Sequence, residues 1–241
     1  MIFYRPWRPV QALSFDLDDT LYHNDPVLFT AEANTLKYLQ QFSACEHTDK
    51  AFWQNAKGQV LSHNPSLNKD MTLLRRASLE YGLEQCGYQG QELSAKVELA
   101  FHEFYRLRSD FKVSEEVQQT LGVLSQRMPL VAITNGNVNV DSIGLGGIFQ
   151  HCFHASIKQP MKPHPIMFER CSAVLNIAPQ QILHIGDNLI KDVYGALKVG
   201  FKSAWLAVDR EMILTDEPQR VLPHIQLANL GELLDLFVDT D

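Results

Sequence analysis

Short apolar runs alternate with longer stretches of helical spacing over much of the chain. Segments with apolar residues every three or four positions begin at Ser114 and near Pro165, and another ends at Gly200. The apolar runs around them predict buried strands at residues 10–14, 130–134, 152–155, 182–185 and 203–207. Because strands alternate with helices, we expect an α/β fold with a parallel, doubly wound sheet.

The stretch between the first two predicted strands shows no strand pattern. Asp25 and Pro26 suit an N-cap and first turn, and a helical period then continues to Phe42. Further helices are predicted over residues 48–61, over about 70–85, and around the apolar positions from Leu93 to Leu107. Four consecutive helices predict a small all-α bundle.

This bundle interrupts the α/β pattern, so we interpret it as an insertion. We expect the α/β core to comprise residues 1–22 and 111–241, and the inserted bundle to comprise residues 23–110. The two linkers, near His23–Asn24 and Asp110–Phe111, are expected to act as hinges.

Composition narrows the class of protein and its partners. The 241 residues are 45% hydrophobic and 20% charged, as in ordinary soluble proteins, and the net charge of −7 argues against nucleic acid or an anionic membrane as a partner. No apolar run reaches transmembrane length, and the first nine residues lack the apolar region of a signal peptide. The four cysteines show no C-x-x-C spacing. We expect a cytoplasmic monomer or small homo-oligomer.

Polar clusters follow three of the predicted strands. Asp16 and Asp18 follow the first, Thr134 begins the cluster after the second, and Asp187 follows the fourth, with Asp192 shortly after. Ligands of open α/β sheets bind beyond the carboxyl ends of the strands. Each cluster alone is explained as well by an ordinary turn, but chance is a poor explanation for all of them on one rim.

Asp16 and Asp18 have the spacing of two side chains that point the same way from an extended chain. Neighbouring carboxylates repel each other unless a cation lies between them, and oxygen ligands suit Mg²⁺. Together, the polar clusters that follow these strands fit transfer of a phosphoryl group through an aspartyl-phosphate. Asp16 would be the nucleophile and Asp18 the general acid and base. Asp16, Asp187 and the backbone carbonyl of Asp18 would bind the metal.

The other polar residues complete this hypothesis. Thr134 and the backbone N–H groups of Asn135 and Gly136 would bind phosphoryl oxygens, and Lys162 would balance the negative charge. Asp192 would lie behind them and orient Lys162 or a metal-bound water. His184, inside an apolar strand, is expected to be a hydrogen-bonded core residue.

Four motifs carry a family resemblance. In chain order, they resemble the four motifs of the haloacid dehalogenase superfamily: Asp16–Thr20, Ile133–Gly136, Lys162–Phe168 and Gly186–Asp192. The resemblance implies a Rossmann-like core and a magnesium-dependent hydrolase that acts on a small-molecule phosphomonoester. The inserted bundle resembles the C1 cap of that superfamily.

Further segments resemble one bacterial subgroup, the flavin-related phosphatases: Phe3–Pro6, Phe15–Tyr22, Leu130–Asn137 and Leu222–His224. The resemblance implies 5-amino-6-(5-phospho-D-ribitylamino)uracil or flavin mononucleotide as substrate. The cap would then recognise the heterocycle and the ribityl hydroxyls, with candidate aromatic contacts at Tyr38, Trp53, Tyr81 and Tyr105.

Alternatives remain open. A general sugar-phosphate or nucleotide phosphatase, or a phosphomutase, would use the same four motifs. A receiver-like phospho-accepting switch needs no insertion as long as residues 23–110 and no Asp18 to activate water. A haloacid dehalogenase needs no Mg²⁺, and Asp18 would be out of place in it.

Overall fold

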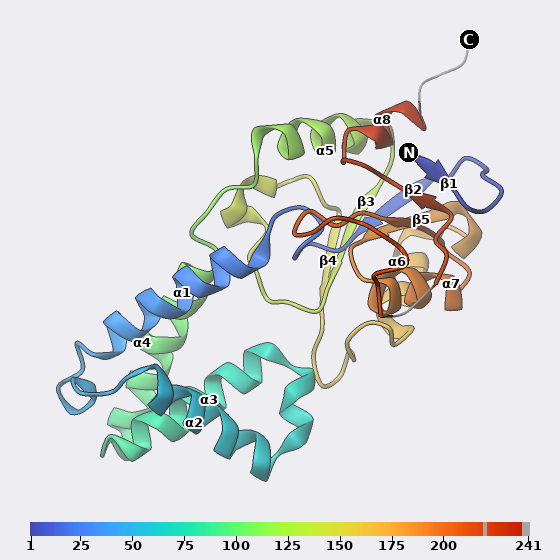
Figure 1. Ribbon diagram of the computed structural model, residues 1–241. Helices are drawn as coiled ribbons and strands as arrows, with labels where there is room; N and C mark the ends of the chain where they lie inside the picture. The colour runs from blue at the N-terminus through green and yellow to red at the C-terminus, as the bar shows by residue number, and fades with distance from the viewer. Residues whose placement is uncertain (219–220, 238–241) are drawn as a thin grey trace.

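One β-sheet forms the centre of the molecule. The computed structural model describes residues 1–218 and 221–237, and within them seven strands form a sheet of order β1-β7-β6-β5-β2-β3-β4 (Figure 1). The strands are β1 (Ile2–Phe3), β2 (Ala12–Phe15), β3 (Leu130–Thr134), β4 (His151–His154), β5 (Ile182–Gly186), β6 (Lys202–Trp205) and β7 (Ile225–Gln226).

The strands that carry the polar clusters are neighbours. β2 lies between β3 and β5 and is parallel to both, with Phe15 opposite Ala132 on one side and Ile185 on the other. Every residue of these three strands is buried, as is usual for a parallel sheet covered on both faces. The α/β fold is therefore confirmed, and the carboxyl ends of β2, β3 and β5 lie side by side.

The sheet is mostly, not wholly, parallel. β1 pairs antiparallel with β7, and neither strand was predicted. Each has only two residues, too few to show a period of two, so no pattern in the sequence marks them. The five predicted strands are all present within one or two residues of their expected bounds.

Helices cover both faces of the sheet. Leu121 and Leu124 of α5 (Glu115–Arg127) cluster with Leu13 and Phe15 of β2. On the opposite face, α6 (Ile166–Leu175) packs against residues of β3. The smaller helical segments of the core are η3 (Asp141–Leu145), η4 (Pro179–Gln181), η5 (Leu189–Tyr194), α7 (Gly195–Lys198) and α8 (Glu232–Asp235).

Helices α1 to α4 form the insertion between β2 and β3, below and to the left of the sheet in Figure 1. The insertion has its own hydrophobic cluster, which includes Leu39, Leu83 and Phe101. This confirms a helical insertion of the C1-cap kind; its boundaries at residues 23 and 110 stay a prediction. Its segments are α1 (Asn24–Leu39), η1 (Ser43–Cys45), α2 (Lys50–His63), η2 (Pro65–Lys69), α3 (Met71–Gln85) and α4 (Gly90–Arg108).

Aspartate side chains cap the N-termini of two helices of the insertion. Asp49 accepts a hydrogen bond from the Phe52 N–H at 2.8 Å, and Asp70 accepts one from the Leu73 N–H at 2.9 Å. The second carboxylate oxygen of Asp70 also accepts a hydrogen bond from the Ile157 N–H, 3.2 Å away in the core. The start of α3 is thereby tied to the α/β core.

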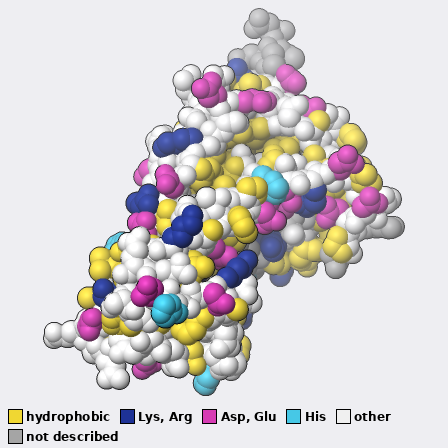
Figure 2. All heavy atoms as spheres, turned by 60° about the vertical axis from the view of Figure 1, so that its left-hand side comes forward, with side chains coloured by type: hydrophobic (Ala, Val, Ile, Leu, Met, Phe, Trp, Pro, Cys, Tyr) yellow, Lys and Arg dark blue, Asp and Glu magenta, His cyan; other side chains and the backbone are white. Residues whose placement is uncertain are grey.

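The surface in Figure 2 shows two lobes, with acidic and basic side chains interspersed over both. In the part of the chain that the structure describes, no helix is long and apolar enough to span a membrane. The cytoplasmic location stays a prediction.

Candidate active site

The predicted site residues lie where β2, β3 and β5 end. Asp16 directly follows β2, Thr134 is the last residue of β3, and Asp187 directly follows β5. The Asp16 N–H still donates to the Ile185 carbonyl at 2.8 Å, so Asp16 is held in the ladder between the two strands. Adjacent parallel strands therefore bring residues 171 positions apart to one edge.

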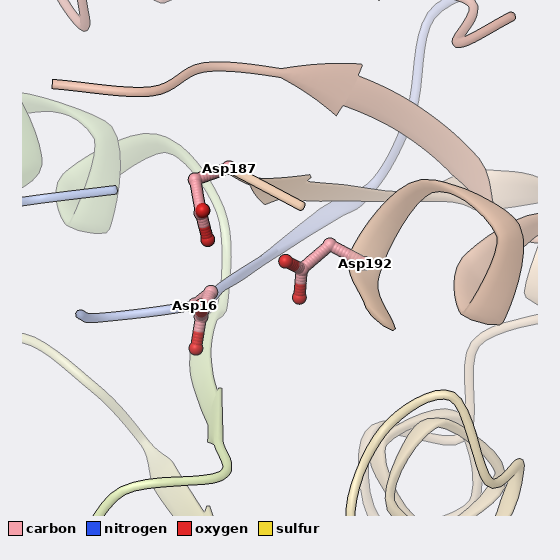
Figure 3. Close-up of side chains that lie close together, drawn as sticks. All are labelled: Asp16, Asp187 and Asp192. Atoms are coloured by element: carbon pink, nitrogen blue, oxygen red, sulfur yellow. The ribbon is translucent and has the colours of Figure 1, made fainter. Parts of the chain in front are cut away.

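Three carboxylates meet at this edge. One oxygen each of Asp16, Asp187 and Asp192 lie within 4.8 Å of one another, and Figure 3 shows the side chains of Asp187 and Asp192 directed toward that of Asp16. Asp192 comes from η5, which follows β5. Asp16 and Asp192 are buried. Because buried carboxylates repel each other, the cluster requires protons or cations.

Lys162 supplies one cation. Its Nζ lies 2.7 Å from Asp16 Oδ1 and 2.6 Å from Asp192 Oδ1, and only 1% of its side chain is exposed. Burial alone would lower the pKa of Lys162, but Asp16 and Asp192 raise it above its usual value. Lys162 is therefore a fully charged ammonium between two carboxylates.

The side chain of Asn135 fixes the backbone at Lys162. Asn135 Oδ1 accepts a hydrogen bond from the Lys162 N–H at 2.8 Å, and Asn135 Nδ2 donates to the Lys162 carbonyl at 3.1 Å. The sequence predicted a role for the backbone N–H of Asn135 only. Its paired contact with a residue 27 positions away has no signal in the sequence.

Asp192 is held from behind by His184. His184 is buried in β5, with Nδ1 2.9 Å from Ser14 Oγ and Nε2 3.1 Å from Asp192 Oδ1. Burial lowers the pKa of His184, so the ring is neutral at pH 7. Because a carboxylate only accepts, the ring proton is assigned to Nε2, and Ser14 donates to Nδ1. The predicted core role of His184 is confirmed.

Asp192 is the most strongly stabilised anion of the three. The Asn188 N–H donates to its Oδ2 at 3.0 Å, while Lys162 and His184 contact Oδ1. Burial alone would raise the pKa of Asp192, but the positive Lys162 and the His184 hydrogen bond lower it well below the usual range.

Asp16 and Asp187 have the opposite shift. Burial raises the pKa of Asp16 well above its usual value, and the attraction of Lys162 offsets this only in part. Burial and the charge of Asp192 raise the pKa of Asp187 to about 7. Without a further cation, these two carboxylates hold protons more readily than free aspartates do. Their oxygen ligands and excess negative charge fit a divalent metal ion.

Arg210, which no pattern in the sequence predicted, also contacts Asp187. Its Nη1 lies 3.2 Å from Asp187 Oδ2, and its Nη2 donates to the Asp187 carbonyl at 2.9 Å. Arg210 lies in the segment after β6. That segment has neither strand nor helix periodicity to indicate where it returns to the sheet.

Asp18 is not part of the carboxylate triad. Its Oδ1 accepts hydrogen bonds from the Tyr22 hydroxyl and, at 2.6 Å, from Arg108 Nη2. β2 ends at Phe15, so the strict alternation that would align Asp18 with Asp16 does not extend to Asp18. The two aspartates therefore have separate sets of partners.

The loop after β3 lies against Asp18. The Gly136 N–H donates to Thr134 Oγ1 at 2.9 Å, which leaves the buried Thr134 hydroxyl hydrogen available to another acceptor. A Cβ on Gly136 would lie 2.4 Å from Asp18 Oδ2. Glycine at this position thus allows the loop and the Asp18 carboxylate to touch. Binding of phosphoryl oxygens by Thr134, Asn135 and Gly136 stays a prediction.

Known proteins resemble this chain over nearly its whole length. Residues 10–200 match the family model described as haloacid dehalogenase-like hydrolase. The chain is 34% identical to the 5-amino-6-(5-phospho-D-ribitylamino)uracil phosphatase YigB of Escherichia coli (strain K12), over 98% of this chain and 100% of that protein. It is 26% identical to the glyceraldehyde 3-phosphate phosphatase of Pyrococcus furiosus, over 95% of this chain and 93% of that protein.

Solved structures share the fold. A 2-haloacid dehalogenase from Pseudomonas syringae pv. Tomato DC3000 superposes with a TM-score of 0.85 and 28% identity, over 94% of this chain and 97% of that chain. The HAD-hydrolase YfnB from Bacillus subtilis, bound to magnesium, superposes with a TM-score of 0.61 and 20% identity, over 95% of this chain and 99% of that chain.

The raised pKa of Asp187 predicts how the stability of the folded protein depends on pH. Between the usual carboxyl pKa and about 7, the unfolded chain releases this proton while the folded protein keeps it, so the free energy of unfolding falls as pH rises through that window. Mg²⁺ competes with protons for these oxygens. We therefore expect Mg²⁺ to raise Tm more at pH 8 than at pH 5, measured by calorimetry.

Two variants test where this effect arises. Asp187→Asn should remove most of the Mg²⁺-dependent gain in Tm, whereas Asp216→Asn, an exposed aspartate outside the triad, should keep it. An equal gain at both pH values, or in both variants, would contradict a metal site at this triad.

Gly136→Ala tests the contact with Asp18. The added Cβ would displace the carboxylate, and a displacement of about 1 Å can cost roughly a hundredfold in rate. We expect kcat to fall by about that factor with little change in Tm. Gly122→Ala is the control, because a Cβ there meets no atom within 4 Å. Similar kcat values in both variants would show that the contact is unimportant.

Proposed function

Because the chain belongs to the haloacid dehalogenase-like hydrolase family and is one of its phosphatases, we propose that it hydrolyses a phosphomonoester of the riboflavin pathway through an aspartyl-phosphate on Asp16. The observation that carries this proposal is the contact of Asp16 with Lys162, inside a triad of carboxylates. It combines a nucleophile, a fixed cation and a set of oxygen ligands at one edge of the sheet.

In the first half-reaction, a carboxylate oxygen of Asp16 attacks phosphorus. The new bond joins that oxygen to phosphorus, and the ester bond to the leaving oxygen breaks with its electron pair. Asp18 gives a proton to the leaving oxygen, so an alcohol departs. Lys162 stays beside Asp16 and offsets charge on the phosphoryl group.

In the second half-reaction, Asp18 accepts a proton from water, and the water oxygen attacks phosphorus. The bond between phosphorus and Asp16 breaks, which releases inorganic phosphate and restores the carboxylate. The Thr134 hydroxyl, whose oxygen accepts from the Gly136 N–H, would donate to a phosphoryl oxygen in both halves.

Asp16, Asp187 and the backbone carbonyl of Asp18 would hold Mg²⁺. The buried triad and the raised pKa of Asp187 fit such an ion. When bound, Mg²⁺ supplies positive charge to the phosphoryl oxygens. Asp192 is committed to Lys162 and His184 and would orient Lys162 without binding the metal directly.

The substrate proposal is supported by the 34% identity with YigB over the full length of both chains. The insertion would recognise the part of the substrate beyond the phosphate. Of the aromatic candidates there, Tyr38 packs against Phe42 in the hydrophobic cluster of the insertion. Trp53 lines a cavity of about 370 Å³ between α1, α2 and α3, and Tyr105 lines a hollow beside the linker residues Asp110 and Phe111.

Two competing functions have a specific observation in their favour. A dehalogenase is favoured by the TM-score of 0.85 with the 2-haloacid dehalogenase. A phosphatase of small sugar phosphates is favoured by the similarity to glyceraldehyde 3-phosphate phosphatase. Asp18 favours a phosphatase over a dehalogenase, because its carboxylate is held against the loop after β3, where the leaving oxygen would need a proton.

The substrate is tested by comparing kcat/KM among phosphomonoesters. We expect 5-amino-6-(5-phospho-D-ribitylamino)uracil and flavin mononucleotide to exceed glucose and glycerol phosphates by at least about tenfold, because the cap must discriminate groups beyond the phosphate. Equal turnover would leave a general phosphatase. Halide release from a 2-haloacid in excess chelator would instead establish a dehalogenase.

The mechanism is tested with two variants. Asp16→Asn should lower kcat on the order of 10⁴-fold or more, because the amide is a poor nucleophile. Asp18→Asn should still form phosphoenzyme from p-nitrophenyl phosphate but hydrolyse it slowly, since that leaving group needs no proton. Rapid-quench trapping of phosphoenzyme measures both steps. Wild-type turnover by Asp16→Asn would rule out the covalent route.

A further inference from the structure

Arg108, the last residue of α4, reaches from the insertion into the candidate active site. Its Nη2 donates to Asp18 Oδ1 at 2.6 Å and to Asn24 Oδ1 at 2.7 Å, and only 4% of its side chain is exposed. No sequence motif marked it. Burying an arginine is costly unless its charge is compensated, so this placement calls for a physical reason.

The first reason lies in how Asp18 is oriented. Arg108 and the Tyr22 hydroxyl both bond to Oδ1 of Asp18. The other oxygen, Oδ2, is the one that faces Gly136, and among the described residues it has no hydrogen-bond partner. Arg108 and Tyr22 thus turn the free oxygen of Asp18 toward the loop after β3.

The second reason concerns Nη1, the other terminal nitrogen of the Arg108 guanidinium. Arg108 Nη1 is buried and has no hydrogen-bond partner among residues 1–218 and 221–237. A buried donor without an acceptor costs free energy, and arginine has five donors to satisfy. In a site for phosphomonoesters, an oxygen of the substrate is an acceptor of suitable charge.

We propose that Arg108 is a positioning residue of this active site, which aims Asp18 Oδ2 at the leaving oxygen and offers Nη1 to a phosphoryl oxygen of the substrate. This proposal rests on the proposed phosphatase function. Arg108 belongs to the insertion and Asp18 to the core, so the contact makes the orientation of Asp18 depend on the position of the insertion.

A purely structural role is the competing explanation. Arg108 contacts Asn24 at the first linker, and a cation at the end of α4 also suits the helix dipole. Such a role would change stability and would affect all substrates alike. A positioning role must instead depend on whether the leaving group needs a proton.

The test uses Arg108→Gln and the conservative Arg108→Lys. The rate of the first phosphoryl transfer is measured by rapid quench with p-nitrophenyl phosphate and with the alkyl phosphate that wild type turns over fastest. For Arg108→Gln, we expect this rate to fall about a hundredfold with the alkyl phosphate, because general acid catalysis is lost, and less than about fivefold with p-nitrophenyl phosphate. Arg108→Lys should fall between Arg108→Gln and wild type. Equal losses with both compounds would overturn the orienting role.

Inorganic phosphate tests the second contact. As a competitive inhibitor, it should bind Arg108→Gln about tenfold more weakly than wild type, the loss expected for one charged hydrogen bond. The same loss should appear in the Asp18→Asn background, because it does not act through Asp18. An unchanged inhibition constant in both backgrounds would overturn the Nη1 contact.

Arg106→Gln is the matched control. Arg106 lies in the same last turn of α4, is 58% exposed, and pairs with Glu103 and Asp110. It should leave both rates and the inhibition constant unchanged. A wild type inactive toward every phosphomonoester would overturn the proposed function and this inference with it, whereas an active wild type matched by Arg108→Gln would overturn this inference alone.

Discussion

The rest of the site depends on one buried ammonium, that of Lys162, between Asp16 and Asp192. Three carboxylates at one edge of the sheet would repel each other, and this cation holds two of them in place. Its position is in turn fixed by Asn135 at the backbone, and by His184 and Ser14 behind Asp192. Residues of β2 and β5, and the residue that follows β3, thus surround a single charge.

Asp16 and Asp18 are close in the chain but have different surroundings. Asp16 lies in the buried cluster, where burial raises its pKa and Lys162 opposes that rise. Asp18 contacts a different cation, Arg108, and a phenol, Tyr22. Two carboxylates of identical chemistry can therefore take different parts in one reaction because each has its own partners.

The strand ends and the residues that follow them could be predicted from the sequence, because apolar runs and adjacent polar clusters are local signals. Asp16, Thr134, Asp187 and Asp192 were proposed as site residues in this way, whereas Lys162 was proposed as the cation that balances their charge. Arg108 and Arg210 were not proposed, since their contacts with Asp18 and Asp187 join positions 90 and 23 residues apart, and neither arginine lies in a polar cluster that directly follows a predicted strand. The strands β1 and β7 were missed because two residues carry no period.

Asp70 gives the insertion a second support. One of its carboxylate oxygens caps the N-terminus of α3, and the other accepts a hydrogen bond from the Ile157 N–H of the core. Asp70 itself is far along the chain from the two linkers. The insertion is therefore attached to the core at two places, through the linkers and through the contact of Asp70, and not through the linkers alone. Breaking the hydrogen bond between Asp70 and the Ile157 N–H costs about 1.5–3 kcal/mol net, because the acceptor is a carboxylate. That cost is several times the thermal energy, so a motion of the insertion that keeps this contact is favoured over one that breaks it.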